Sequence, residues 1–131
     1  MDLIEITDTF EFLDDWEDKY RFIIDLGKAL PDLPEDQRRD EYLVPGCQSQ
    51  VWLVCSEQDG IVQLQIDSDA LIVRGLIAIL LAAYNGQSKA DILAFDVDAL
   101  FQQLELMQHL SPTRGNGLMA MLQRIQAYAK S

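Results

Sequence analysis

VWLVCSEQDGIVQLQID, residues 51–67, contains the features that decide the fold class. Two runs rich in apolar and β-branched residues, Val51–Ser56 and Ile61–Asp67, flank Asp59-Gly60, a strong hairpin signal because glycine accepts a positive φ. In the second run, apolar residues alternate with glutamines, which is typical of a strand with one buried face. A lone hairpin is marginally stable, so we expect a third strand, for which Tyr42–Val44 is the nearest candidate.

Helical patterns lie on both sides of this hairpin. Residues 70–84 are apolar nearly all round, which predicts a central helix capped by Ser68. We expect further helices at 16–30 (capped by Asp14 or Asp15), from Ser88, from Asp96 or Asp98 to Leu106, and from Ser111-Pro112 onward, with a short turn at 7–13. The sequence therefore predicts one α+β domain over residues 1–131, with a small antiparallel sheet of about three strands covered by helices.

Charge and hydropathy narrow the function classes. Ten basic and 22 acidic residues give a net charge of −12, which would repel a phosphate backbone, so we expect no nucleic-acid partner. The acidic residues form solvated faces or steer the chain toward a basic patch on a protein partner. The segment MDLIEITDTF lacks the basic region of a signal peptide, the longest apolar run (Gly75–Tyr84) is too short for a bilayer, and no cysteine near Ser131 offers an anchor. We expect a soluble, cytoplasmic protein with no membrane association, or one in an equivalent organelle compartment.

The chain has two cysteines, Cys47 and Cys55. The two lie eight positions apart, so that if the segment between them is extended they are about 26 Å apart, whereas a disulfide needs Cα atoms within about 7 Å. We therefore expect two free thiols, as in a reducing compartment. Cys55 lies within a predicted strand and is typical of a small apolar core residue.

Cys47 occupies a different setting, in VPGCQSQ at residues 44–50. Pro45-Gly46 suits the central pair of a type II turn, which puts Cys47 at the last turn position, on a projecting loop. Loops carry function more often than core elements do. Position alone leaves a structural and a functional role for Cys47 equally open.

The other residues of the chain narrow the kinds of thiol chemistry that are open to Cys47. His109 is the only histidine, and nothing in the sequence places it beside Cys47 as a base. The chain has no CxxC pair and no spacing typical of a zinc site. The remaining chemistries need one cysteine only: disulfide exchange, peroxide reduction or acceptance of sulfur from another protein.

Four blocks of the sequence resemble the SufE family, sulfur-acceptor proteins that serve cysteine desulfurases. Gly46-Cys47-Gln48-Ser49-Gln50-Val51-Trp52 resembles the family signature. The other blocks are, in order, Trp16–Tyr20 with Ile24–Lys28 and Leu30-Pro31, then Asp67–Asp69 with Ile72–Leu76, and finally His109–Arg114 with Gly117-Leu118. They span nearly the whole chain.

The resemblance implies a fold shared with IscU-type scaffolds and a role for Cys47. A pyridoxal-phosphate cysteine desulfurase (SufS- or CsdA-like) would hold sulfur as a persulfide, and Cys47 would take it, stimulate the enzyme and pass the sulfur to iron–sulfur cluster assembly. The partner supplies the pyridoxal phosphate, so this chain would need no cofactor and no metal. The segment 35–41 departs from the family pattern and is a candidate for recognising a particular desulfurase.

Residues near Cys47 are further candidates. Gly46, Gln48, Ser49 and Gln50 are expected to contact the loop or the partner. Gly115 and Gly117 weaken the start of the last helix, which suggests a close backbone approach there, for example by the cysteine loop.

For each of three charged residues, the sequence allows both a structural and a functional interpretation. Asp67 and Asp69 suit the start of the central helix as capping residues, and the resemblance places this turn near the cysteine loop, which they would restrain. Arg114 is a cation near a helix start, which is unfavourable by about 0.3–1 kcal/mol. It either faces the Cys47 loop, lowering the thiol pKa or meeting a partner carboxylate, or is an exposed side chain bridged to an acid.

Two alternative functions remain at this point. The chain could activate a desulfurase without carrying sulfur. It could also be an iron–sulfur scaffold, which is disfavoured because such sites need about three thiolates or an equivalent ligand set.

Overall fold

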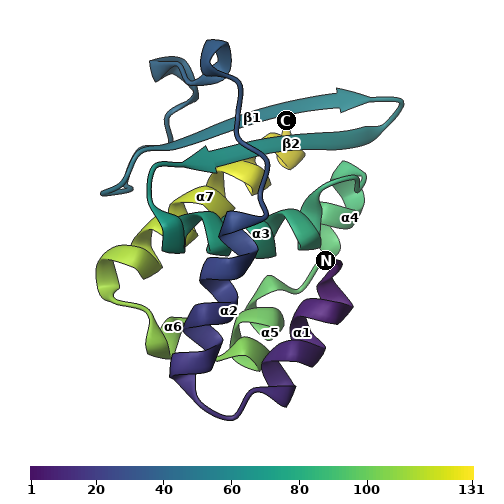
Figure 1. Ribbon diagram of the computed structural model, residues 1–131. Coiled ribbons are helices and arrows are strands. Elements are labelled where there is room, and N and C mark those ends of the chain that lie inside the picture. The colour runs from purple at the N-terminus through teal and green to yellow at the C-terminus, as the bar shows by residue number, and fades with distance from the viewer.

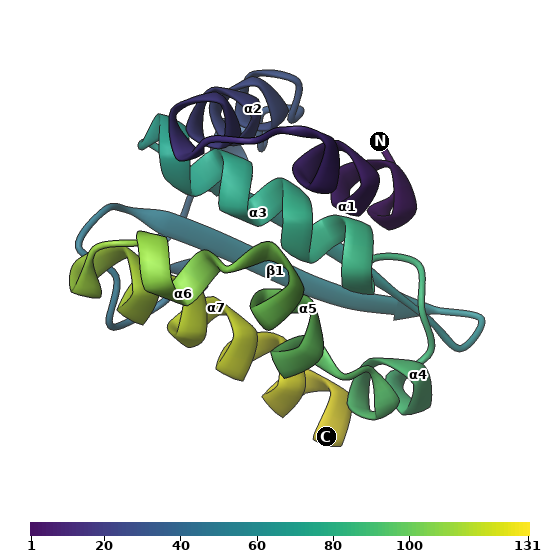
Figure 2. The ribbon, with the colours of Figure 1, turned by 90° about the horizontal axis from the view of Figure 1, so that it is seen from below.

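The computed structural model describes residues 1–131 and has seven α-helices and one antiparallel hairpin. Figure 1 shows the hairpin above two long helices, and Figure 2 shows α3 between the α1–α2 side of the molecule and the α5–α7 side. The helices are α1 (Leu3–Phe12), α2 (Trp16–Lys28), α3 (Leu71–Tyr84), α4 (Lys89–Ala94), α5 (Val97–Leu104), α6 (Leu106–His109) and α7 (Pro112–Lys130). The strands are β1 (Val51–Gln58) and β2 (Ile61–Ser68), and the 3-10 turns are η1 (Glu35–Gln37) and η2 (Asp40–Tyr42). The predicted α+β class is confirmed.

The hairpin has the predicted position and turn. Gln58 pairs with Ile61 across Asp59-Gly60, whose φ values of 54° and 79° are typical of a tight hairpin turn. Leu53 pairs with Ile66 on the buried face, which α3 and α7 cover. This cover supplies the packing that an isolated hairpin lacks.

The predicted third strand at Tyr42–Val44 is wrong. Leu43 forms only an isolated bridge with Trp52, and the Val44 N–H donates to the Val51 carbonyl at 2.9 Å. The 3-10 turn η2 ends at Tyr42 and the Pro45-Gly46 turn follows at once, so too few residues are extended to form a strand. The sheet therefore has two strands.

Local capping explains most helix starts. Asp15, Ser88, Asp96 and Ser111 each accept a hydrogen bond from a backbone N–H three residues later, as expected for N-caps. Asp2 and Glu5 form a capping box, so the region expected to be a short turn at 7–13 is part of a full helix, α1.

Two helix boundaries differ from expectation. Ser68 is the last residue of β2 and does not cap the central helix, which begins at Leu71 without a side-chain cap. Helix α5 ends at Leu104 because Glu105 has φ of 55°, and α6 begins directly after it.

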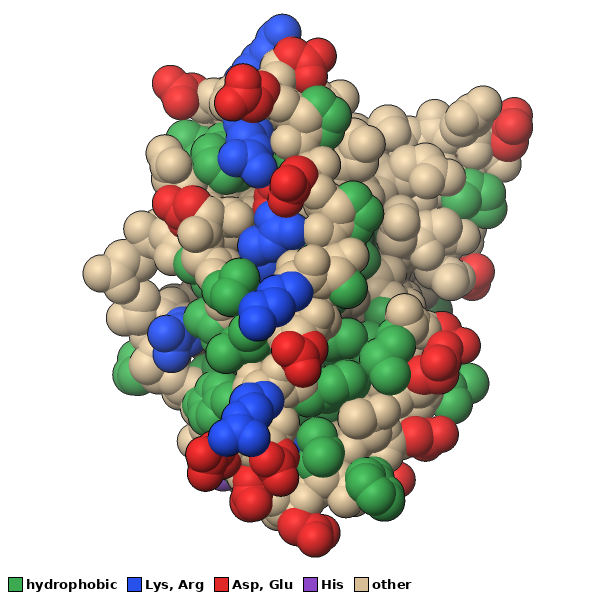
Figure 3. Space-filling model, in the orientation of Figure 1, with side chains coloured by type: hydrophobic (Ala, Val, Ile, Leu, Met, Phe, Trp, Pro, Cys, Tyr) green, Lys and Arg blue, Asp and Glu red, His purple; other side chains and the backbone are tan.

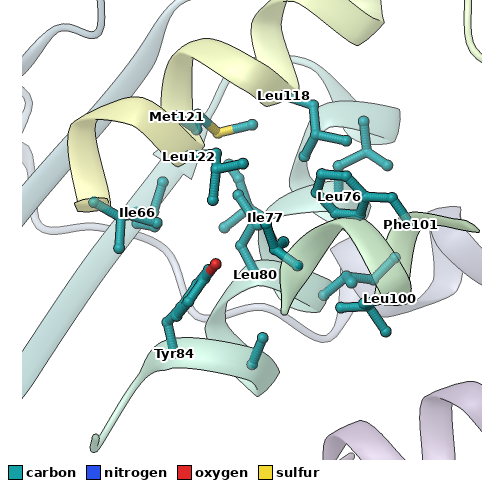
Figure 4. Close-up of a cluster of buried hydrophobic side chains, with 14 of the residues drawn as sticks. Ile66, Leu76, Ile77, Leu80, Tyr84, Leu100, Phe101, Leu118, Met121 and Leu122 are labelled. Carbon is teal, nitrogen blue, oxygen red and sulfur yellow. The ribbon is translucent and has the colours of Figure 1, made fainter. Parts of the chain in front are cut away.

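The core lies between α3 and its neighbours. Figure 4 shows Leu76, Ile77 and Leu80 of α3 among side chains from β2, α5 and α7. The nearly all-apolar pattern of residues 70–84 thus reflects a helix covered on several sides. None of the helices has both the length and the apolar character needed to cross a bilayer.

Helices α2 and α3 touch through their backbones at two glycines. A Cβ atom added to Gly75 would lie 2.0 Å from the Ile23 carbonyl oxygen, and one added to Gly27 would lie 2.7 Å from the Gly75 nitrogen. This crossing holds α2 against the central helix at a distance that no larger residue permits.

We expect Gly75→Ala to lower the free energy of unfolding by about 3 kcal/mol, because the helices must separate to admit a methyl group. Urea denaturation measures the change. Gly115→Ala is the matched control, since its Cβ would meet only the flexible end of Met107 at 3.1 Å. The control should be neutral or stabilising by up to about 1 kcal/mol through helix propensity. Equal stability of the two variants would contradict the close contact at Gly75.

The face that contains α2 carries mixed charge. Figure 3 shows a row of Lys and Arg side chains on this face, with Asp and Glu side chains beside them. Arg21 pairs with Glu17 at 3.3 Å, and Arg39 pairs with Glu41 at 3.4 Å. Acidic side chains therefore interrupt the basic surface here.

Candidate functional site

Cys47 lies in the cysteine loop, residues 45–50, between η2 and β1. Gly46 has φ of 89°, in agreement with the predicted type II turn at Pro45-Gly46. Gly46, Gln48 and Gln50 are exposed, but Cys47 is half-buried and its Sγ lies 3.7 Å from the carbonyl oxygen of Gly117. The loop lies at the surface as expected, whereas the thiol is packed against the apolar core.

The thiol lines a cavity of about 320 Å³, here called the cysteine pocket. Its apolar walls come from α3 and α7, and its polar rim comes from the cysteine loop and the start of α7. The wall residues include Ile72, Val73, Leu76, Leu118 and Met121, and the rim residues include Gln48, Ser49, Ser111, Thr113 and Arg114. The structure thus brings four predicted residues, Cys47, Gln48, Ser49 and Arg114, to one site.

Burial raises the pKa of the Cys47 thiol above its ordinary value. A docked Cys47 is therefore protonated at neutral pH and is a weak nucleophile. No positive charge lowers its pKa in this arrangement, so the suggested effect of Arg114 on the thiol is absent while the loop is docked.

Arg114 is exposed at the rim of the cysteine pocket and forms no ion pair with an acid. Its backbone N–H donates to the Ser111 Oγ at 3.3 Å. The interpretation of Arg114 as an exposed side chain bridged to an acid is therefore wrong, and its guanidinium is free to contact another molecule.

Asp69 anchors the cysteine loop. Its Oδ1 accepts the Gln50 N–H at 3.2 Å, and its own N–H donates to the Gln50 carbonyl at 3.3 Å. This pair of bonds ties the loop to the turn between β2 and α3. The expected restraint of the loop by Asp69 is therefore present in the structure.

Asp67 lies outside the cysteine pocket and is fully buried. Its carboxylate binds Arg74 through Oδ1 and Arg38 at 2.7 Å through Oδ2, and Oδ2 also accepts the Leu33 N–H at 2.9 Å. The expected capping role of Asp67 is wrong, because these partners and the Ser68 N–H occupy both oxygens.

Sequence reasoning did not identify Arg74 as a structural partner. Its guanidinium also donates to the carbonyls of Gly27 at 3.1 Å and Leu30 at 2.6 Å, so it joins α2, β2 and α3. A charged residue within an otherwise apolar helix was the available signal, since a buried charge needs partners.

The two glycines of α7 have different neighbours. Gly117 faces the Cys47 Sγ, which a Cβ would approach at 3.7 Å, whereas Gly115 faces Met107. The predicted approach to the cysteine loop therefore holds for Gly117 and not for Gly115.

Cys55 and His109 do not join Cys47. Both cysteines are free, and burial raises the pKa of Cys55 to about 11 in its place on β1. The His109 ring stacks on Trp16 and lies outside the cysteine pocket. Cys47 is consequently the only thiol of the site, without a histidine base beside it.

This geometry defines a class: an α+β domain in which one loop cysteine docks into a pocket between two helices. The chain belongs to the SufE family. The family model, described as "SufE: Fe-S metabolism associated domain", matches residues 4–129.

Two relatives agree with this assignment, and a solved structure shares the fold. The chain is 49% identical over 132 residues to an uncharacterized SufE-like protein from Rhizobium etli, covering 98% of this chain and 89% of that one. It is 46% identical to an uncharacterized SufE-like protein from Rhizobium meliloti, covering 98% and 94%. The solution structure of a hypothetical protein from Thermus thermophilus has the same fold, with a TM-score of 0.77, 22% identity and coverage of 98% and 93%.

The anchor at Asp69 leads to a testable expectation. Asp69→Ala removes the bond to the Gln50 N–H, which is worth about 1 kcal/mol, so the loop should undock more often. We expect iodoacetamide to alkylate Cys47 about five times faster than in the parent protein. Mass spectrometry of the Cys47 peptide over time measures this rate.

The pH profile and a control sharpen this test. Because burial raises the pKa of docked Cys47, the alkylation profile of Asp69→Ala should lie at lower pH than that of the parent. Asp8→Ala, which removes an exposed carboxylate of α1, should leave both rate and profile unchanged. An unchanged Asp69→Ala profile would show that Asp69 does not hold the loop.

Proposed function

We propose that this protein is a sulfur carrier that takes sulfur from a cysteine desulfurase onto Cys47 and delivers it to iron–sulfur cluster assembly. The observation that carries the proposal is the single thiol on a surface loop, docked by few hydrogen bonds into a pocket of about 320 Å³. The membership in a family associated with Fe–S metabolism supports the same role.

The transfer is a thiol–disulfide type of exchange. The Cys47 thiolate attacks the outer sulfur of a persulfide on the partner's cysteine, and a new sulfur–sulfur bond forms at Cys47. The bond between that outer sulfur and the partner's cysteine breaks, and the partner's cysteine leaves as a thiolate. Atoms and electrons balance without an oxidant, and the pyridoxal phosphate that releases the sulfur from L-cysteine belongs to the partner.

The loop must leave the cysteine pocket for this step. The docked thiol is half-buried and protonated, whereas attack needs an accessible thiolate. When the loop returns, the pocket shelters the persulfide from oxidation, to which such sulfur species are prone.

Partner contacts surround the pocket. Arg114, Gln48 and Gln50 are exposed at or beside its rim and are available to bind the desulfurase while Cys47 extends. The two free thiols suit a reducing compartment, and we propose the cytoplasm or an equivalent organelle compartment.

Intact mass under non-reducing conditions tests the proposal. After incubation with a cysteine desulfurase and L-cysteine, the protein should gain one sulfur atom, located on the Cys47 peptide and removed by a reductant. An unchanged mass together with a faster desulfurase would identify an activator that carries no sulfur. Visible absorption with bound iron would identify a scaffold, for which the pocket offers one thiol and not the roughly three expected.

A further inference from the structure

The start of α7 forms a large part of the rim of the cysteine pocket. Ser111, Thr113 and Arg114 lie on this rim, and the Gly117 carbonyl contacts the Cys47 Sγ. Only two residues separate Pro112, the first residue of α7, from His109, the last residue of α6. The place of His109 therefore constrains where the rim can lie.

His109 is clamped to α2, beside which α6 lies in Figure 1. Its ring stacks on Trp16 with centroids 4.0 Å apart and planes 12° apart, and the Tyr20 hydroxyl donates to the His109 carbonyl. The Nδ1 of His109 lies 3.0 Å from the Glu105 carbonyl oxygen, so Nδ1 carries a proton. We call Trp16, Tyr20 and His109 the Trp16–His109 clamp.

The opposite wall of the pocket, formed by α3, is also held against α2. Helix α3 supplies Ile72, Val73 and Leu76 and lies against α2 through the Gly27–Gly75 contact. One wall is thus tied to α2 by the glycine contact, and the α7 rim is tied to α2 by the clamp. Both ties therefore act on the separation of the two sides, in addition to the direct packing of α7 on α3 in the core.

We propose that Trp16, Tyr20 and His109 are positioning residues that set the width of the cysteine pocket and thereby how firmly Cys47 docks. The proposal rests on the proposed function for its biological meaning. Its physical content is independent of sulfur transfer: a loosened clamp lets the start of α7 move, which weakens the contact between Gly117 and the thiol.

Alkylation of Cys47 tests the clamp without any desulfurase. Tyr20→Phe removes one hydroxyl and its hydrogen bond, and we expect Cys47 to react with iodoacetamide about five times faster. His109→Ala removes the stacked ring and should have an effect of similar size, with the pH profile of Cys47 moved to lower pH. His109→Phe keeps a flat ring against Trp16 and should restore most of the parent rate.

Two controls separate positioning from general destabilisation. Tyr128→Phe removes a hydroxyl near the end of α7 that is far from the cysteine pocket and should leave the alkylation rate of Cys47 unchanged. Cys55, on β1, is an internal reporter, since global unfolding would expose both thiols equally. A Tyr20→Phe protein with the parent Cys47 rate, or with Cys47 and Cys55 accelerated to the same degree, would overturn the proposal. Failure of sulfur transfer itself would appear only in the mass measurement with a desulfurase.

Discussion

Replacing Cys47 with serine is expected to abolish sulfur loading. A serine hydroxyl is not ionised at neutral pH and cannot form a persulfide. Cys47 is the only thiol that lines the cysteine pocket, so no other group there can replace it. Loss of a nucleophile of this kind lowers a rate by at least about a thousandfold. The measurements are the intact mass after incubation with a cysteine desulfurase and L-cysteine, and the rate of sulfide release.

Cys55→Ser is the matched control for this substitution. Cys55 is a free thiol on β1, outside the cysteine pocket, and its raised pKa of about 11 keeps it protonated. The control should gain one sulfur atom like the parent protein. Sulfur found on Cys55 in the Cys47→Ser protein, or full stimulation of the desulfurase by that protein, would contradict the assignment of Cys47 as the carrier.

Asp67→Asn is expected to lower the free energy of unfolding by about 3–5 kcal/mol. The parent carboxylate is fully buried and pairs with both Arg74 and Arg38, which are themselves 12% and 32% exposed at the side chain. The amide keeps the shape but removes the buried counter-charge of both guanidiniums, and Arg74 then keeps only the exposed carboxylate of Asp32 at 3.1 Å. Breaking one partner of a buried pair has a cost of this size. This cost is a large part of the roughly 5–15 kcal/mol typical of a small domain. Urea denaturation measures it.

An exposed ion pair provides the comparison. Arg39 and Glu41 lie 3.4 Å apart with side chains that are 62% and 60% exposed. Glu41→Gln should change stability by less than about 1 kcal/mol, because water screens such a pair. If Asp67→Asn were as mild as Glu41→Gln, the buried carboxylate would not hold α2, β2 and α3 together.

Features that depend on neighbouring residues could be predicted from the sequence. Asp59-Gly60 produces the hairpin turn, and Pro45-Gly46 produces the turn that places Cys47 on a surface loop. Ser88 and Ser111 cap their helices with bonds to residues three positions away. These interactions form within a few residues, so the local sequence is sufficient to predict them.

The candidate site was predictable in part. The turn and the loop position made Cys47 a candidate, and the family resemblance added its role, its flanking residues and Arg114. The approach of the cysteine loop to Gly117 was also predicted. The docking of the thiol into a pocket was not predictable, because the walls of this pocket come from α3 and α7, far along the chain.

Other features depend on contacts between segments that are distant in the sequence. Asp67 binds Arg38 and Arg74 and caps no helix, and His109 stacks on Trp16. Each outcome depends on which distant segments the packing of α3 brings together. A short stretch of sequence contains the preferences of its own backbone, but the partners of a buried charge, a strand edge or an aromatic ring come from elsewhere in the chain.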